Sequence, residues 1–418
     1  MKRSTWIAPS ALLILVLAAA GCGKEKVCPA DETNVGGTCY ALQSDPKNCG
    51  SRGNVCGAAQ GCSAGTCVEC ASSSGLCTTS VLAACFNLKQ VRPLGAGLTA
   101  SDVPLATDAG PNAITRVGGR FFVANSTAST VSNFTLSPPT AANGAASVQV
   151  PTGGGFADLE GVSARNGVLW ISNAATSTLV GVDAATGAVV EEIPFTGSFS
   201  SPQGVDFVGT KAYVALNGTN QVAVVDLAAG TPGNRPTTYI DLSALGTNGA
   251  NAAPARVLAV GTKVYVTLND LFVFVPSFGT VTGAYGKLAT IDSASDALVG
   301  DPVDLGADCW DASGIAVSGT TLWVACGYFD QFGTGAIHGG AIVPVELASG
   351  PPIAGAAIKL TDAATSVAIC NGRGYAGMSN SGTVTSFDPT TRAVLGSAVA
   401  CPVDPGKASF VPALACPN

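Results

Sequence analysis

Residues 159–173 read LEGVSARNGVLWISN, and this fifteen-residue pattern recurs five more times. The other copies are residues 111–125, 202–216, 254–268, 312–326 and 364–378. In each copy a β-branched residue is followed nine positions later by a small or β-branched one, as with Val162 and Ile171, and a turn containing Gly or Asn lies between them. Two short apolar runs joined in this way predict a β-hairpin. Self-similarity with a period of about 20–50 residues indicates a propeller or a solenoid.

Further apolar segments follow the hairpins. After residues 159–173 come the segments 178–183 (TLVGVD) and 188–193 (AVVEEI), and successive hairpins lie 43 to 58 residues apart. Four short strands per unit of about 40–50 residues are typical of a propeller blade. The sequence therefore predicts an all-β fold with a six-bladed β-propeller. Seven blades are the alternative, if residues 86–107 and 408–416 form another, but six is preferred because neither segment carries the nine-residue spacing.

The repeats resemble the YVTN/NHL-like β-propellers. The residues that carry the resemblance are LWISN at 169–173 followed by TLVGVD, and AYVALN at 212–217 followed by QVAVVD. The resemblance implies the propeller fold. It names no ligand, because propellers serve many functions.

Residues 1–21 have the pattern of an export signal. Lys2 and Arg3 precede an apolar run at 11–20, and that run is too short to span a bilayer, which takes about 20 residues. The segment ends LAAAGC, which resembles a bacterial lipobox, although Ala19 stands where a large aliphatic residue is usual. The resemblance implies lipid attachment at Cys22, and Gly23 favours the outer membrane. An ordinary cleaved signal peptide is the alternative.

The 15 cysteines suit an exported, disulfide-bonded protein. Without Cys22, nine lie in residues 28–85 and five lie in the later repeats and tail: Cys309, Cys326, Cys370, Cys401 and Cys416. Because both numbers are odd, complete pairing requires at least one bond between the two regions. We expect Cys309 to pair with Cys326, because the hairpin returns Cys326 to the neighbourhood of Ser313. The other pairings stay open.

Residues 28–85 predict a small disulfide-rich module, because so few apolar residues cannot build a core. The run DPKNCG at 45–50 resembles the Cys-rich modules written DPxNCGxCGxxC in secreted proteins of myxobacteria, with Arg52 where another Cys is expected. Zinc binding by CVEC at 67–70 is the alternative to disulfides. The expected organisation is a signal peptide at 1–21, a tether at 22–27, the Cys-rich module at 28–85, a linker at 86–110 and the propeller at 111–418.

The residue just before each innermost strand of a propeller faces the central channel. In this chain those residues are Asn112, Glu160, Gln203, Ala255, Ser313 and Thr365. Arg256 follows the fourth of them, and Asp311 lies two positions before the fifth. We expect five of these side chains to converge at one channel mouth: Asn112, Glu160, Gln203, Arg256 and Asp311. Such a ring would bind a polar ligand or Ca²⁺, which takes oxygen ligands, or form a hydrated hydrogen-bonded channel.

Charge and missing motifs narrow the function. The net charge is −7 without a Lys/Arg cluster, which argues against nucleic acid as a partner. A single histidine, His338, excludes a His-based triad and a multi-His metal site. Gluconolactonase-like propellers place Glu, Asn and Asp around a divalent metal, and only Glu160 and Asn112 match that set. An insert at 270–286 predicts an extra hairpin or an exposed aromatic lip.

These observations favour a lipid-anchored propeller of the cell envelope, held by its N-terminal lipid at the outer membrane. Its expected role is non-catalytic, as a binding or scaffolding platform for protein or glycan, with no cofactor or with Ca²⁺. The alternative is a lactonase- or lyase-like enzyme that depends on Ca²⁺ or Zn²⁺ at the channel mouth and is centred on Glu160.

Overall fold

The computed structural model describes most of residues 79–417 and short segments nearer the N-terminus. The gaps after residue 79 are 96–97, 99–103, 137–146, 154, 156–157, 198, 248–250, 273–281, 284, 330–335, 348–349 and 403–409. The described N-terminal residues are 33–35, 38–40, 42, 48–54, 60–63 and 66–69. They include two small hairpins, β1 (Thr33–Val35) with β2 (Thr38–Tyr40) and β3 (Gln60–Ser63) with β4 (Thr66–Glu69). No helix in the described part is long and apolar enough to cross a membrane. The signal segment and Cys22 lie outside the described residues.

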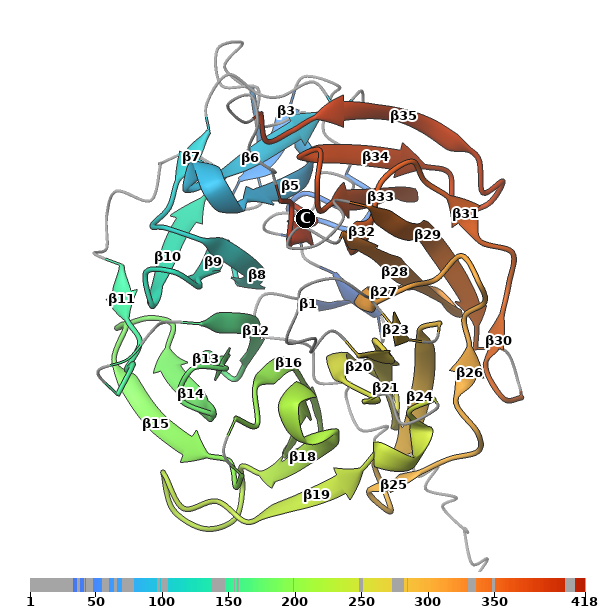
Figure 1. Cartoon of the computed structure of the whole chain (residues 1–418). Coiled ribbons are helices and arrows are strands. Elements are labelled where there is room, and N and C mark those ends of the chain that lie inside the picture. The colour runs from blue at the N-terminus through green and yellow to red at the C-terminus, as the bar shows by residue number, and fades with distance from the viewer. Residues whose placement is uncertain are drawn as a thin grey trace, which may run out of the picture.

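Seven sheets surround a central channel, so the protein is a seven-bladed β-propeller (Figure 1). Six blades come from the six repeats, in chain order. Blade 1 has β8 (Pro111–Val117), β9 (Arg120–Asn125), β10 (Thr130–Thr135) and β11 (Val148–Gln149). Blade 2 has β12 (Leu159–Arg165), β13 (Val168–Asn173), β14 (Thr178–Asp183) and β15 (Val189–Pro194). Blade 3 has β16 (Pro202–Val208), β17 (Lys211–Leu216), β18 (Gln221–Asp226) and β19 (Thr237–Asp241).

The next three blades follow the same plan. Blade 4 has β20 (Pro254–Val260), β21 (Lys263–Leu268), β24 (Lys287–Asp292), β25 (Ala297–Leu298) and β26 (Val303–Asp304). Blade 5 has β27 (Ala312–Ser318), β28 (Thr321–Phe329), β29 (Ile337–Glu346), β30 (Ile353–Ala354) and β31 (Ile358–Lys359). Blade 6 has β32 (Ala364–Cys370), β33 (Arg373–Met378), β34 (Thr383–Phe387) and β35 (Val394–Val399). Short 3₁₀ turns lie at Phe86–Leu88, Asn217–Thr219 and Ser243–Leu245.

The nine-residue spacing has a direct structural cause. Val162 and Ile171 face each other across β12 and β13, and the equivalent residues pair in the other five repeats. Asn166 and Gly167 both have positive φ, 50° and 76°, as a two-residue hairpin turn of the primed type requires. The predicted hairpins are therefore confirmed.

The preference for six blades is wrong. A closing blade combines β36 (Leu414–Ala415) from the C-terminus with β5 (Thr79–Cys85), β6 (Gln90–Gly95) and β7 (Leu105–Ala106) from the N-terminal side. Its two innermost strands come from opposite ends of the chain, so no continuous nine-residue hairpin exists for the sequence to reveal. The propeller consequently begins by Thr79 rather than Pro111, and the segment expected to be a linker supplies strands.

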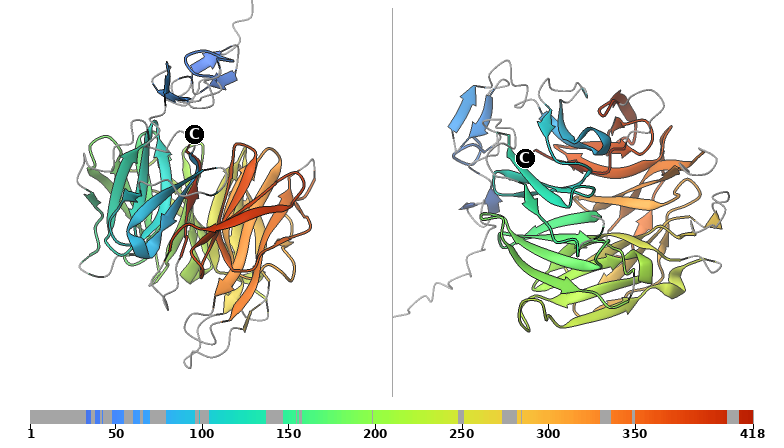
Figure 2. Two further views of the ribbon diagram at one scale, coloured as in Figure 1. Left: turned by 90° about the horizontal axis from the view of Figure 1, so that it is seen from above. Right: turned by 60° about the vertical axis from the view of Figure 1, so that its left-hand side comes forward.

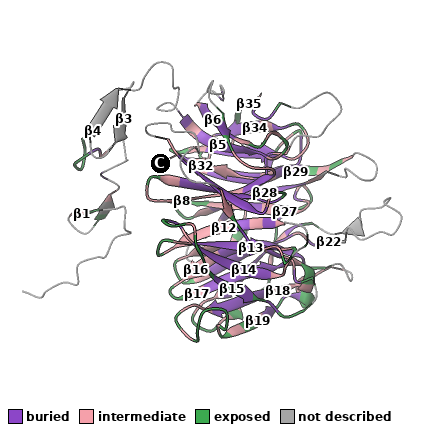
Figure 3. Cartoon of the chain, turned by 90° about the vertical axis from the view of Figure 1, so that its left-hand side faces the viewer, coloured by how far each residue is buried: buried purple, intermediate pink, exposed green. Residues whose placement is uncertain are grey.

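Apolar packing between neighbouring blades forms the core. The described residues contain seven buried clusters, and each joins two adjacent blades. One of them packs Tyr213 of blade 3 against Val264 and Val266 of blade 4. Full burial of each such side chain contributes about 1.5–3 kcal/mol. Figure 3 shows buried positions concentrated in the strands, and Figure 2 shows the ring of blades from two other sides.

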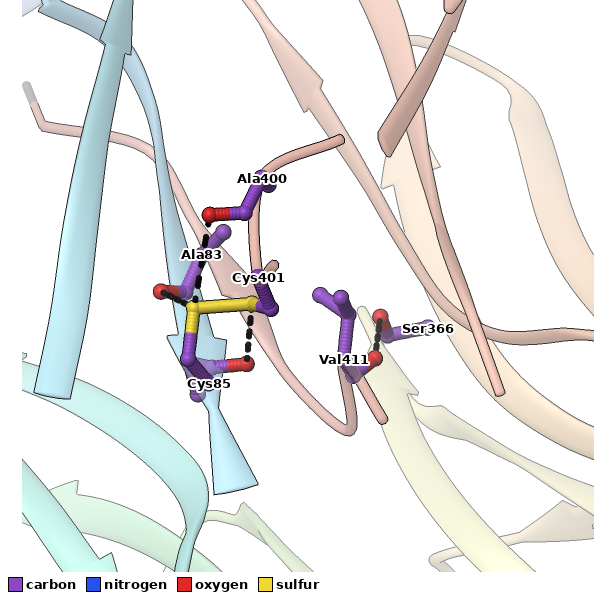
Figure 4. Close-up of a disulfide and its surroundings, with 7 residues drawn as sticks. Ala83, Cys85, Ser366, Ala400, Cys401 and Val411 are labelled. Carbon is purple, nitrogen blue, oxygen red and sulfur yellow. Dashed lines mark hydrogen bonds between the residues drawn. A yellow bond between two sulfur atoms is a disulfide. The ribbon is translucent and has the colours of Figure 1, made fainter. Parts of the chain in front are cut away.

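Three disulfides reinforce this ring. Cys309–Cys326 confirms the predicted pair, with Cα atoms 4.8 Å apart. Cys85–Cys401 joins the N-terminal cysteines to the repeats, as the odd counts require, and Cys370–Cys416 fastens the C-terminal strand to blade 6. In Figure 4 the Cys85–Cys401 disulfide links β5 to the chain beyond β35. Beside it, the Ser366 hydroxyl donates to the Val411 carbonyl at 2.9 Å.

Residues near the two ends of the insert at 270–286 pair with each other and form the predicted extra hairpin. Its strands are β22 (Leu271–Phe272) and β23 (Thr282–Gly283). The side chains of Phe274 and Phe278, proposed for the aromatic lip, lie outside the described residues.

Candidate functional site

A bulge begins the innermost strand of each repeat. The register with the second strand shifts at Pro111/Ala113, Leu159/Gly161, Pro202/Val205, Pro254/Val257, Ala312/Gly314 and Ala364/Ser366. Within these shifts lie the expected channel-facing residues: Asn112, Glu160, Gln203, Ala255, Ser313 and Thr365. A bulge leaves its extra residue out of the ladder and re-aims the side chain. The bulge is therefore the device that turns these side chains toward the channel.

Small residues beside the bulges let the innermost strands approach one another. A Cβ on Gly204 would lie 2.8 Å from the Cα of Arg256, and a Cβ on Gly314 would lie 2.8 Å from the carbonyl oxygen of Thr365. Because both obstacles are backbone atoms, a side chain at either position would push two blades apart. These glycines bring the channel-facing residues close enough to act on one ligand.

The channel-facing residues border a cavity of about 570 Å³, called the channel mouth below. All five predicted residues line it: Asn112, Glu160, Gln203, Arg256 and Asp311. A second cavity of about 420 Å³ lies along the middle of the innermost strands and shares Asn112, Glu160 and Arg256 with the mouth. The volume suits a small ligand or the end of a larger one, since such sites measure roughly 300–1,000 Å³.

Sequence reasoning missed a second ring of mouth residues. Four of them directly follow a fifteen-residue repeat, and Phe86 directly follows β5; those that border the mouth are Phe86, Ser126, Asn269, Gly327 and Ser379. Their shared repeat position was a signal that could have identified them, except Phe86, whose blade lacks the repeat. Asp158, Tyr328, Phe410 and Pro412 also border the mouth and follow no repeat signal.

Glu160 is held in a carboxyl pair. Asn112 Nδ2 donates to Glu160 Oε2 at 3.0 Å and to the Leu159 carbonyl at 3.1 Å. Burial, followed by the negative charge of Asp158, raises the pKa of Glu160 to about 7, although Arg256 acts in the opposite direction. Glu160 and Asp158 also share a hydrogen bond. The Ser126 hydroxyl donates to Asp158 Oδ1 at 3.0 Å, which fixes the second carboxylate.

Arg256 places a positive charge near two carboxyl groups, those of Glu160 and Asp311. Burial also raises the pKa of Asp311 to about 7, with Arg256 lowering it in part. Burial lowers the pKa of Arg256, and the charges of Glu160 and Asp311 partly restore it. The mouth thus combines one guanidinium with carboxyls that titrate near neutrality.

Several polar atoms at the mouth lack a partner. Among the described residues, five mouth side chains have a buried nitrogen or oxygen without a hydrogen bond: Arg256 Nη1, Asn269 Oδ1, Asp311 Oδ1, Ser313 Oγ and Ser379 Oγ. Buried polar groups are otherwise hydrogen-bonded in proteins, because leaving one unpaired costs about 1–3 kcal/mol. All five side chains line the mouth, so the unpaired atoms belong to its wall.

Two observations bear on whether the mouth could hold a divalent metal. Within the described residues, no three His, Cys, Asp or Glu side chains form a group that could hold a metal ion. Arg256 places a positive charge near both Glu160 and Asp311, where a cation would be repelled. His338 contacts Trp310 and Tyr328 by its ring.

Comparison with known proteins supports the fold alone. No family model and no curated protein matches the chain. Among solved structures, a putative 6-phosphogluconolactonase from Bacteroides uniformis is 13% identical with a TM-score of 0.55, covering 77% of this chain and 96% of its own. Virginiamycin B lyase from Staphylococcus aureus is 12% identical with a TM-score of 0.52, covering 69% and 84%. A β-propeller domain from Myceliophteria thermophila is 10% identical with a TM-score of 0.50, covering 70% and 86%. These likenesses include both enzymes and a domain of another kind, so function has to be argued from the site.

Proposed function

We propose that the protein is a non-catalytic binding module of the bacterial envelope that takes a polar group of a protein or glycan into the channel mouth. The observation that carries the proposal is the set of five buried, unpartnered polar atoms around one cavity. A ligand that supplies their hydrogen bonds gains affinity, because it removes a cost that the free protein bears.

The course of strand β5 supports the idea that the mouth faces away from a lipid anchor at Cys22. Cys85 ends β5, and the next residue, Phe86, borders the mouth. Thr79 begins the same strand, so it lies about 20 Å away along the strand, toward the opposite face. A tether from a lipidated Cys22 would therefore reach the propeller on the far side and leave the mouth free for a partner.

Lipid anchoring is tested by changing the attachment residue. Cys22→Ser in the full precursor is expected to move the protein from the membrane fraction to the soluble fraction, because a peptide tether without acyl chains has no strong affinity for lipid. Ser4→Ala, in the same signal segment, is the matched control and should leave the protein in the membrane fraction. Membrane retention of the Cys22→Ser protein would reject the anchor.

A metal-dependent lactonase or lyase is left out of the proposal because no donor group for a metal lies among the described residues. Calcium is nevertheless tested directly, by thermal unfolding of the full mature chain in detergent with Ca²⁺, Zn²⁺ or chelator. A rise in the midpoint that Glu160→Gln removes would establish the metalloenzyme alternative, because ligands of the native state stabilise it by mass action.

Binding at the mouth is tested with a pair of variants at one position. Ser313→Phe fills the mouth, whereas Ser313→Ala leaves it open and removes one unpartnered hydroxyl. Thermal shifts are measured against panels of saccharides and short peptides. A ligand at 100 times its wild-type Kd should stabilise the wild type by about 2.7 kcal/mol, stabilise Ser313→Ala less because one hydrogen-bonding hydroxyl is lost, and leave Ser313→Phe unchanged. An equal response of all three proteins would place the ligand elsewhere and reject the mouth as the binding site.

A further inference from the structure

The rim of the channel mouth carries aromatic rings on two sides. On one side Phe86 and Phe410, from the closing blade, meet edge to face with ring centres 5.6 Å apart, and both border the cavity. On the other side Tyr328 borders the cavity. Figure 1 shows that these two sides belong to different parts of the ring, the closing blade and the blade of β28 and β29.

The second side continues outward as an aromatic cluster. His338 lies opposite Tyr328 across β28 and β29, with ring centres 6.2 Å apart, and Trp310 lies 5.1 Å from His338. Tyr285 meets Trp310 edge to face at 6.1 Å and is 41% exposed. The backbone N–H of Gly327, a mouth residue, donates to the Trp310 carbonyl. Trp310 directly precedes Asp311, which borders the mouth, but its own side chain is not among the residues that line the cavity and is joined to Tyr328 through His338.

A glycine makes room for this indole. Gly339 has a φ of 67°, and a Cβ there would lie 2.9 Å from Trp310 Cδ1 and 2.8 Å from the Asp308 carbonyl. The hairpin of β28 and β29 could not lie against Trp310 with a larger residue at 339. The cluster is therefore built into the fold rather than left on a loose surface.

The floor of the mouth requires a ligand that both donates and accepts hydrogen bonds. Arg256 Nη1 is an unpartnered donor, whereas Asn269 Oδ1 and Asp311 Oδ1 are unpartnered acceptors. The hydroxyls of Ser313 and Ser379 can do either. Hydroxyl groups suit a floor with both kinds of atom, because each hydroxyl donates once and accepts twice.

The charges of the floor disfavour a strongly charged ligand. An anion on Arg256 would face Glu160, Asp158 and Asp311, and a cation would face Arg256. A neutral ligand meets neither repulsion. An aromatic rim and a polar floor together favour a ligand that has polar edges and an apolar ring face.

We propose that the ligand is an uncharged sugar ring of a glycan, with its hydroxyls on the polar floor and its apolar C–H face against the ring of Tyr328, which His338 and Trp310 support from outside the cavity. This proposal rests on the proposed binding function of the mouth and narrows it to one ligand class. A peptide chain end is the competing ligand.

The chain contains an intrinsic fluorescence probe near the mouth. Of its four tryptophans, Trp6 belongs to the export signal, and Trp170 and Trp323 are 6% and 3% exposed. Trp310 is partly exposed and contacts His338, which in turn contacts Tyr328, so a ligand on Tyr328 should change the emission of Trp310. Tryptophan fluorescence and calorimetry of the full mature chain are recorded with cellobiose, maltose, lactose and chitobiose. Glucuronic acid, glucosamine and a tripeptide with a free carboxylate are the charged probes.

We expect at least one neutral disaccharide to change the emission and to bind at least tenfold more tightly than the charged probes. Tyr328→Leu should weaken that binding at least fivefold by calorimetry, whereas Tyr328→Phe should retain most of it. Phe199→Leu is the matched control, because Phe199 is 86% exposed and does not border the mouth. Its affinity should equal that of the wild type.

Three outcomes would overturn the sugar proposal. If the charged sugar or the tripeptide binds and the neutral sugars do not, the mouth is a binding site for another class and only the sugar inference falls. If neutral sugars bind equally well to Tyr328→Leu, the aromatic rim is not part of the site. If neither these probes nor the wider saccharide and peptide panels bind in a manner that Ser313→Phe blocks, the binding function falls as well.

Discussion

At the residue scale, the mouth keeps ionisable groups where water is scarce. Burial disfavours a charged carboxylate, and a nearby positive charge offsets part of that cost. Glu160 and Asp311 show both effects, since burial is the leading cause of their raised pKa and Arg256 opposes it. Replacing Arg256 with a neutral side chain would therefore raise both pKa values further.

These two carboxyls predict a pH dependence of stability. In the unfolded chain their pKa values are near 4.5 and 3.8, whereas in the folded protein both are about 7. Between these values the folded state binds more protons, so the free energy of unfolding falls as pH rises from about 4 to 7. The full shift of each group corresponds to a loss of roughly 3–4 kcal/mol, at about 1.36 kcal/mol per pKa unit. Glu160→Gln and Asp311→Asn should each flatten the dependence measured by urea unfolding.

An exposed aspartate provides the control of opposite sign. Hydrogen bonds from Thr186 lower the pKa of Asp183, so this residue stabilises the fold above its unfolded pKa and the effect is lost as pH falls. Asp183→Asn should therefore leave the slope between pH 4.5 and 7 intact. A wild-type stability that is constant over this window would contradict the raised pKa values.

At the scale of the strands, the sequence predicted most of what positions the mouth. The nine-residue spacing is a cross-strand pair, and the residue before each inner strand is a bulge residue, so both features repeat where the chain is continuous. The partner-free state of Arg256 Nη1 or Ser313 Oγ could not be predicted, because it depends on how neighbouring blades pack and not on any local pattern. The aromatic rim was not predicted for the same reason, since Phe86, Tyr328 and Phe410 belong to different segments of the chain.

Because the inner strands approach closely, alanine substitutions at two glycines should differ sharply in their effect on the free energy of unfolding. Gly314→Ala places a Cβ 2.8 Å from the Thr365 carbonyl oxygen and 2.9 Å from Ser366 Cα, so blade 6 must shift. Overpacking of this kind costs about 1–3 kcal/mol. Gly119→Ala is the matched control, because nothing lies within 4 Å of its Cβ. Its free energy of unfolding in denaturant should change by less than about 0.5 kcal/mol, and equal losses for the two variants would refute the close-approach argument.

At the scale of the whole molecule, stability depends on how the ring is closed. Strands from the two ends of the chain form one blade, and the cluster around Val81, Ala83 and Val411 packs that blade against blade 6. Closure cannot be deduced from periodicity, because it joins residues at the maximum separation in sequence. In the sequence, only the odd cysteine counts of the two regions indicated this closure, because they required a disulfide between the regions. That disulfide is Cys85–Cys401.

This closure predicts that two buried disulfides differ in their contribution to stability. Cys85–Cys401 spans 316 residues, whereas Cys309–Cys326 spans 17, and all four cysteines are 0% exposed. A cross-link restricts the unfolded chain more when the loop is longer, and the difference between these loops amounts to about 2–3 kcal/mol. The double variant Cys85→Ala/Cys401→Ala should therefore lose that much more free energy of unfolding in urea than Cys309→Ala/Cys326→Ala.

The two double variants remove the same atoms from equally buried sites, so their packing losses are matched. Cys370–Cys416 remains in both and keeps β36 near blade 6. Loss of Cys85–Cys401 should also weaken ligand binding at the mouth, because Phe86 and Phe410 form the wall beside this bond. If both variants lose equal stability, chain entropy is not what the bond controls, and apolar packing of the closing blade holds the ring together without it.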